Sequence, residues 1–277
     1  MKVLILGANG FLGRNLLKKC LDLKWDVTPV YHIKRGFIPE DIRSINVEDV
    51  FKMNVRYDVI FLLSAFIPYG DLNSTDKRLI ETNIKIPLRI SEKFEKSKIV
   101  YSSSVSVYGN HRGTIKEDSS LNQPGNYGLS KLAGEVFLRF HPKHQIIRFS
   151  SLYGYGMYEK TFIPLKIVEA RKHKTITLFG DGSRRQDYLY IDDAVGYLIA
   201  AAYRKEPGVY LGVNGNSYSN TEVGEIIKNQ LLGCKLNYVG SDNDLSFVYN
   251  NLLTRKILKF TPKISFKEGI KKMITQV

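Results

Sequence analysis

The 277-residue chain is poor in cysteine and in long apolar runs. Two cysteines, Cys20 and Cys234, cannot build a disulfide framework, and with only five histidines a four-ligand zinc site is not expected either. The longest apolar runs, at 59–67 and 194–203, are about half as long as a membrane-spanning helix needs. Four apolar residues before Gly7 are too few for a signal-peptide core. We therefore expect a soluble, cytoplasmic protein without a metal or a membrane partner.

Positive charge is in excess. Lys and Arg number 41 against 27 Asp and Glu, which gives a net charge of +14. A nucleic acid, a phosphate-rich small ligand or merely solvated lysines could each account for such an excess. The basic residues are spread over the whole chain, with one loose cluster at 32–35. This spread favours solvated surfaces or a polyanionic small ligand over a nucleic-acid partner.

Short apolar runs alternate with helical patterns in the first part of the chain. Strands are predicted at 2–6, 27–31, 58–63 and 98–102, and helices from Phe11 onward and over 78–94. Strands that alternate with helices predict a parallel sheet covered by helices on both faces. We expect residues 1–160 to form an α/β, Rossmann-type doubly wound parallel sheet that binds a dinucleotide.

The texture of the sequence changes after about residue 150. Glycine, tyrosine and polar residues become frequent at 150–158 and 179–188. Helical patterns return at 162–171, 192–203, 221–231 and 266–274. We expect residues 161–277 to form mainly a smaller C-terminal substrate-binding lobe, with some segments returning to the core sheet and a ligand between the two parts.

Three glycines, Gly7, Gly10 and Gly13, separate the first predicted strand from the first helix. Glycines at such a turn let backbone amides approach a pyrophosphate, which the helix N-terminus also attracts. The spacing is GxxGxxG and departs from the standard GxGxxG. Because a strand precedes the turn and a helix follows it, the segment still predicts a dinucleotide site.

The end of the second predicted strand bears on the choice between NAD and NADP. An acidic residue there would bind the ribose 2′-hydroxyl of NAD, whereas basic residues favour the 2′-phosphate of NADP. Tyr31 and His32 occupy this position, Lys34 and Arg35 follow, and no carboxylate occurs before Glu40. NADP is therefore favoured over NAD, the alternative being that Lys34 and Arg35 are merely solvated.

A phenol and an ammonium, on Tyr127 and Lys131, are one helical turn apart. A nearby cation stabilises a phenolate, so we expect a partly desolvated Lys131 and an oxidised nicotinamide together to lower the pKa of Tyr127 toward the range useful for acid–base catalysis. The pair alone is a weak signal. Its context strengthens it, because a row of serines at 102–104 ends a predicted strand upstream and could hydrogen-bond a substrate oxygen.

Taken in this order, the motifs resemble the extended short-chain dehydrogenase/reductase family, in particular its sugar-nucleotide epimerases, dehydratases and reductases. Segments 147–154, 179–193, 208–215 and 258–269 resemble the later motifs of that family, so the resemblance runs nearly end to end. It implies an enzyme that uses NADP or NAD on a nucleoside-diphosphate sugar. It also implies a homodimer through the 78–94 helix and the Tyr127 helix, where Val136, Phe137 and Phe140 offer apolar surface.

The resemblance assigns the site residues as well. It makes Ser104, Tyr127 and Lys131 the catalytic triad, with Tyr127 as the acid/base and Ser104 also touching the substrate. It places the cofactor against Gly7, Gly10, Phe11, Leu12, Gly13, Tyr31, His32, Lys34, Arg35, Leu63, Asn83, Tyr127 and Lys131. It directs Arg184, Arg185 and Gln186 toward the diphosphate of the substrate.

Two departures from the family pattern guide the choice of function. Gln186 stands where the family often has arginine, so Arg184 or Arg185 would take over the diphosphate contact. Val105 and Ser106 stand where the 4,6-dehydratases carry an acidic pair, which disfavours elimination of water. Reduction of a 4-keto sugar nucleotide is favoured, with a 4-epimerase that retains NAD as the alternative. A non-catalytic dinucleotide sensor or nucleic-acid-binding protein on the same fold is a minor alternative.

Overall fold

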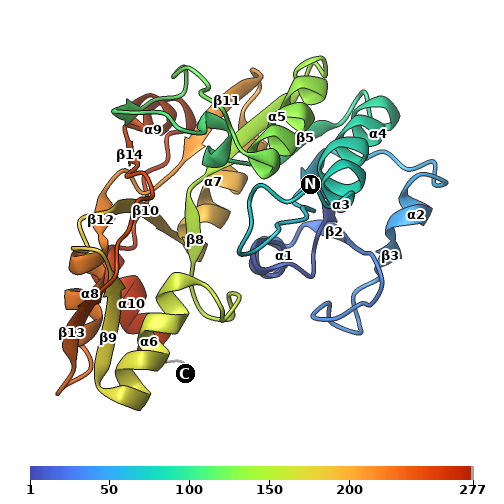
Figure 1. The fold of residues 1–277 in the computed structure, drawn as a ribbon. Helices are drawn as coiled ribbons and strands as arrows, with labels where there is room; N and C mark the ends of the chain where they lie inside the picture. The colour runs from blue at the N-terminus through green and yellow to red at the C-terminus, as the bar shows by residue number, and fades with distance from the viewer. Residues whose placement is uncertain (276–277) are drawn as a thin grey trace.

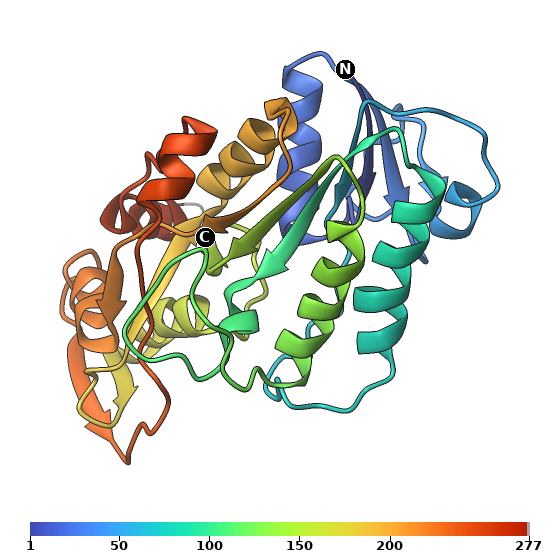
Figure 2. The same ribbon diagram turned by 90° about the horizontal axis from the view of Figure 1, so that it is seen from above.

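The computed structural model describes residues 1–275, which form a helix-covered sheet with a smaller group of strands and helices beside it (Figures 1 and 2). The main sheet has seven parallel strands in the order β11-β7-β5-β4-β1-β2-β3. The strands are β1 (Lys2–Leu6), β2 (Asp26–Tyr31), β3 (Ile45–Asn46), β4 (Val59–Leu62), β5 (Lys98–Ser104), β7 (His144–Phe149) and β11 (Gly208–Gly212). The strand order reverses between β1 and β4, where doubly wound sheets bind ligands at their carboxyl ends. The expected fold class is confirmed.

Helices cover both faces of this sheet. On one face lie α1 (Phe11–Asp22) and α7 (Ile191–Tyr203), and on the other α4 (Ile86–Lys93) and α5 (Asn126–Arg139). Alternate side chains of β1 enter the two cores, Val3 and Ile5 toward α1, and Leu4 and Leu6 toward α4 and α5. A strand buried on both faces has to be continuously apolar, which is why the run at 2–6 predicted it correctly. The short α2 (Val47–Val50) follows β3.

The helix predicted over 78–94 is present but is not uniform. It consists of α3 (Arg78–Ile80), a π-helical turn (Glu81–Lys85) and α4. A π turn widens the helix locally and is frequently found at functional sites. Here it contains Asn83, whose side chain is buried.

The smaller lobe is built from three short sheets. They are β12-β10-β8, β13-β9 and β14-β6. The strands are β6 (Thr114–Ile115), β8 (Ser151–Tyr153), β9 (Thr175–Phe179), β10 (Arg185–Tyr190), β12 (Ser217–Ser219), β13 (Lys235–Val239) and β14 (Val248–Tyr249). The helices are α6 (Phe162–His173), α8 (Asn220–Lys228), α9 (Leu252–Leu258) and α10 (Phe266–Thr275). The four helical patterns predicted after residue 161 coincide with α6, α7, α8 and α10 to within a few residues.

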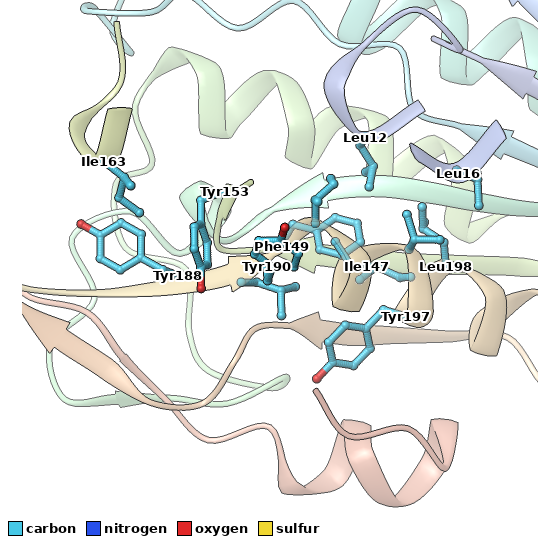
Figure 3. Packing of buried hydrophobic residues seen from close by; sticks show 14 of the residues in the cluster. Leu12, Leu16, Ile147, Phe149, Tyr153, Ile163, Tyr188, Tyr190, Tyr197 and Leu198 are labelled. Atoms are coloured by element: carbon cyan, nitrogen blue, oxygen red, sulfur yellow. The ribbon is translucent and has the colours of Figure 1, made fainter. Parts of the chain in front are cut away.

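One hydrophobic core continues from the main sheet into the smaller lobe. Figure 3 shows Leu12 of α1 and Phe149 of β7 in the same cluster as Tyr153 of β8 and Tyr188 of β10. The segments α7 and β11 come from late in the chain yet pack on or pair with the main sheet. Within residues 1–275, no helix combines the length and the apolarity that crossing a membrane requires.

Candidate active site

The glycine turn leaves no space for side chains. Gly7 has φ +85°, and a Cβ there would lie 2.6 Å from the backbone nitrogen of Ser64. A Cβ on Gly13 would overlap the carbonyl oxygen of Gly7. The helix α1 starts directly after Gly10 without a side-chain cap, so its first amides remain available. These features fit an anion held by backbone amides at a helix N-terminus.

The segment after β2 folds against this turn. The side-chain amide of Asn9 donates to the carbonyl of Lys34 at 2.6 Å and accepts from the amide of Phe37 at 3.1 Å. The guanidinium of Arg35 donates to three carbonyls of its own loop, those of Pro39, Glu40 and Ile42. Arg35 therefore has an intramolecular role that the sequence reasoning did not foresee. His32 and Lys34 have exposed side chains beyond the half-buried Tyr31.

A cavity of about 670 Å³ opens at the carboxyl ends of the central strands, facing the smaller lobe. Predicted residues that line it are Gly7, Gly10, Phe11, Leu12, Gly13, Leu63, Ser104, Tyr127, Lys131 and Gln186. The structure thus brings the glycine turn and the Ser–Tyr–Lys set to one space. Tyr31, His32, Lys34, Arg35, Asn83, Arg184 and Arg185 are not part of this lining.

Strand β5 and helix α5 hold the Ser–Tyr–Lys set. Ser104 ends β5, whereas Tyr127 and Lys131 occupy the first turns of α5. Buried Glu135 joins α5 to two strands: it accepts from the hydroxyl of Ser103 in β5 at 2.6 Å and forms an ion pair with the guanidinium of Arg148 in β7 at 2.7 and 2.9 Å. These contacts hold α5 against β5 and β7, and with it the relative positions of Ser104, Tyr127 and Lys131.

Burial dominates the titration of Tyr127 and Lys131. It raises the pKa of the Tyr127 phenol well above its usual value, and a hydrogen bond with Ser104 only partly opposes this shift. The protein's own groups therefore do not produce the expected lowering of the Tyr127 pKa, because desolvation of the phenolate dominates. Burial also lowers the pKa of Lys131 to about 7, against an opposing contribution from Glu135.

The ammonium of Lys131 has no hydrogen-bond partner among residues 1–275. It lies 4.2 Å from the ring centroid of Tyr101, inside the protein. A buried ammonium without a partner is costly, so a ligand with hydroxyl groups in this cavity would satisfy it. Together with the glycine turn, this orphaned group shows that the site fits a dinucleotide with ribose hydroxyls.

Asn83 does not line the cavity but hydrogen-bonds residues on two segments next to it. Its side chain pairs with both backbone groups of Phe66, at 2.8 and 3.0 Å, and donates to the hydroxyl of Ser130 at 2.9 Å. Ser130 in turn donates to the carbonyl of Tyr127 at 2.7 Å. Asn83 therefore ties Phe66, which lines the cavity, to the helix that carries Tyr127.

A second cavity of about 700 Å³ adjoins the first and shares Ser150, Ser151 and Gln186 with it. Arg184 lines it and contacts two carboxylates, Asp242 at 3.8 Å and Asp244 at 3.0 Å. Arg185 is not in its lining and pairs with Glu222 at 3.1 Å. Much of the remaining wall consists of side-chain amides, namely Asn73, Asn110, Gln123, Asn126 and Asn243.

Comparison with known proteins identifies the family. Residues 3–211 match the model of the NAD dependent epimerase/dehydratase family. The chain belongs to this family. A Methanocaldococcus jannaschii protein, provisionally named a UDP-glucose 4-epimerase, is 25% identical over 98% of this chain and 97% of its own length. The dTDP-4-dehydro-6-deoxyglucose reductase of Escherichia coli is 23% identical over 99% and 97%, respectively.

Solved structures of family members share the fold. The UDP-glucuronic acid 4-epimerase of Bacillus cereus, in complex with UDP-glucuronic acid and NAD, has a TM-score of 0.84 at 22% identity. The alignment covers 99% of this chain and 98% of that one. The resemblance inferred from the motifs is thereby confirmed at the level of family and fold.

The sequence analysis gave no site role to several residues that line the second cavity. Asp187 is buried at the second cavity, where it accepts from the hydroxyl of Ser150 at 2.6 Å and from the amide of Gly215 at 2.7 Å. Burial raises the pKa of its carboxyl to about 6. Phe247 and Tyr249 line the same cavity from a segment with no recognisable pattern. Of these three residues, only Asp187 lies in a segment that the sequence analysis had quoted as a motif, at 179–193.

Proposed function

We propose that this protein is a nucleotide-sugar oxidoreductase that reduces a 4-keto sugar of a nucleoside diphosphate. The observation that carries this proposal is the position of Ser104, Tyr127 and Lys131 beside the glycine turn, in a cavity that joins a second one in the smaller lobe. A bound nicotinamide dinucleotide would supply the hydride. Gly7, Gly10 and Gly13 would hold its pyrophosphate, and Lys131 its ribose.

The titration of Tyr127 supports reduction. A phenol with a raised pKa is protonated at neutral pH and can donate its proton to a carbonyl oxygen that becomes an alkoxide. Ser104 would hydrogen-bond the same oxygen. Lys131 would stabilise the phenolate that remains after the proton has left.

The second cavity is suited to the nucleotide part of the substrate. Its amide side chains can bind sugar and base hydroxyls and carbonyls, and Arg184 can exchange the exposed Asp244 for a phosphate oxygen. Gln186 lies at the junction of the two cavities, where a diphosphate between nucleoside and sugar would pass. We propose a nucleoside-diphosphate sugar as the substrate class.

We propose NADP as the cofactor, with NAD as a competing one. No carboxylate occurs between Tyr31 and Glu40 to bind a 2′-hydroxyl, and the exposed Lys34 and His32 can approach a 2′-phosphate. Arg35 is engaged with its own loop, which leaves Lys34 as the main cationic contact. The Bacillus cereus relative binds NAD, so both cofactors belong in the first binding experiment.

A 4-epimerase is the second candidate. The Methanocaldococcus jannaschii relative carries that name, and epimerisation uses the same Ser–Tyr–Lys set with NAD retained between oxidation and reduction. One experiment separates the two. Purified protein is incubated with NADPH or NADH and a 4-keto-6-deoxy sugar nucleotide, and separately with UDP-glucose alone.

We expect oxidation of the reduced nicotinamide in the first incubation, and loss of that activity in Tyr127→Phe, which keeps the ring and removes the proton donor. Conversion of UDP-glucose to UDP-galactose without added cofactor, together with no oxidation of NADPH or NADH, would instead establish the epimerase.

A further inference from the structure

The wall of the first cavity carries very little charge. Among residues 1–275, Lys131 is the one lining side chain that is a Lys, Arg, His, Asp or Glu. Its ammonium lies against the ring of Tyr101 and is the group that would hold the cofactor ribose. The rest of the wall offers apolar side chains and neutral polar groups, such as the hydroxyls of Ser104 and Tyr127. A charged group on the substrate would therefore find no counter-charge of its own in this cavity.

The apolar part of the wall comes mainly from two loops, at 64–75 and 154–161, that contact each other. Together with the start of α6, they contribute Phe66, Ile67, Met157 and Phe162 to the lining. Tyr69 of the first loop and Tyr158 of the second have their ring centroids 4.7 Å apart. The two loops therefore cover the same side of the cavity, and a group bound beneath them is shielded from water.

The arginines next to these loops are already engaged. The guanidinium of Arg14 donates to the carbonyl of Gly156. The guanidinium of Arg78 lies 4.1 Å from the ring centroid of Phe66 and pairs with the carboxylate of Asp76 at 2.5 Å. Neither arginine lines the first cavity. The cations closest to the two loops thus have partners within the protein and do not face the ligand.

We propose that the sugar of the substrate is neutral, with an uncharged substituent on C5 such as methyl or hydroxymethyl, and that uronates are excluded. This inference rests on the proposed binding of a nucleoside-diphosphate sugar. If C4 reacts beside Tyr127, the C5 substituent is only two bonds from C4 and lies in the first cavity as well.

The chemistry of the wall separates the two kinds of substituent. A carboxylate on C5 would exchange water for apolar side chains and neutral hydroxyls, and burial of an unpaired charge is costly. Its single possible counter-ion, Lys131, would then be withdrawn from the cofactor ribose. A methyl group in the same place buries apolar surface against apolar surface, which is favourable.

The test measures binding and needs no turnover. Calorimetry on the protein saturated with NADP or NAD first selects the nucleotide that binds most tightly among UDP, dTDP, GDP and ADP. The glucose, 6-deoxyglucose and glucuronate conjugates of that nucleotide are then compared, so that the nucleotide contributes equally to each. We expect the glucuronate conjugate to bind at least about tenfold more weakly than the 6-deoxyglucose conjugate, with the glucose conjugate in between.

A matched pair of variants at Met157 tests the cause. Met157→Lys adds a cation to the apolar wall, whereas Met157→Gln adds a polar group of similar length without charge. The lysine variant should improve the affinity for the glucuronate conjugate, relative to the 6-deoxyglucose conjugate, by at least about fivefold. The glutamine variant should leave this ratio of affinities close to that of the wild type.

The outcomes distinguish this inference from the proposed function. Equal affinity of the wild type for the glucuronate and 6-deoxyglucose conjugates would overturn the neutral-sugar inference, whether or not the protein reduces a 4-keto sugar. A preference for the neutral conjugates in a protein that oxidises neither NADPH nor NADH would refute the reductase and leave the inference standing. Failure of all the conjugates to bind would remove the substrate class and the inference together.

Discussion

Replacing Lys131 by methionine should make the protein more stable while abolishing its activity. Burial lowers the pKa of Lys131 from 10.5 to about 7, so holding the ammonium charged in the folded chain costs about 5 kcal/mol relative to the unfolded chain. Methionine has a similar length and no charge. Allowing for imperfect packing, we expect a gain of about 2–4 kcal/mol in the free energy of unfolding at pH 6.

The lowered pKa of Lys131 also predicts how the stability difference between the variant and the wild type changes with pH. Between about pH 7 and 10.5 the unfolded chain binds more protons at Lys131 than the folded chain does, so the stability of the wild type rises with pH across this window. Below pH 7 both states are protonated, and the full cost remains. The advantage of Lys131→Met should therefore be largest at pH 6 and shrink by about 3 kcal/mol by pH 9.

Urea unfolding followed by the fluorescence of Trp25, the single tryptophan, measures this difference. Lys18→Met on the exposed side of α1 serves as the control and should change stability by less than about 0.5 kcal/mol at either pH. If Lys131→Met were less stable than the wild type at pH 6, or its advantage did not change between pH 6 and 9, the desolvation argument would be refuted.

Three further predictions concern the Glu135–Arg148 ion pair, the glycine turn and the exposed C-terminal end of α5. Glu135→Gln breaks the buried pair with Arg148 and should cost about 3–5 kcal/mol in urea unfolding; a loss below about 1 kcal/mol would contradict the structural role given to it. Gly13→Ala pushes a methyl group into the Gly7 carbonyl and should weaken dinucleotide binding at least tenfold by calorimetry, since the turn has to shift. Phe140, directly after α5, is 84% exposed, and Phe140→Asp should turn the homodimer expected from the sequence into a monomer in sedimentation; a monomeric wild type would contradict that expectation.

The parts of the fold that follow from local pattern were predictable. Continuous apolar runs such as 2–6 indicate strands buried on both faces, and helical spacing locates α6, α7, α8 and α10. The π turn around Asn83 was not predictable, because no residue type in the sequence marks where a helix widens. Short strands such as β6 and β14 were not predicted, because a strand of two residues is too short to show an alternation of apolar and polar side chains.

The parts of the candidate site that consist of short sequence motifs were predictable. The glycines and the Ser–Tyr–Lys set lie on segments of strong pattern, and they meet in one cavity. The environment of each group was not predictable. Burial of Tyr127 raises its pKa, and a sequence does not show how deeply a side chain is buried. The hydrogen bonds of Arg35 to backbone carbonyls depend on the conformation of its loop. Tyr249 reaches the second cavity through tertiary packing alone.

The hydrophobic cluster shared by both lobes limits how this enzyme can move and how it can be engineered. Because α1, α6 and α7 contribute to one continuous interior, a hinge between the lobes would have to open that interior to water. We therefore expect ligands to enter by movement of the surface loops at 64–75 and 154–161, whose Tyr69 and Met157 line the first cavity, rather than by rigid-body opening of the lobes. For the same reason, a chimaera that joins residues 161–277 to the nucleotide-binding half of a relative would expose an apolar face without a matching partner. In such chimaeras the core residues of both halves have to be redesigned together.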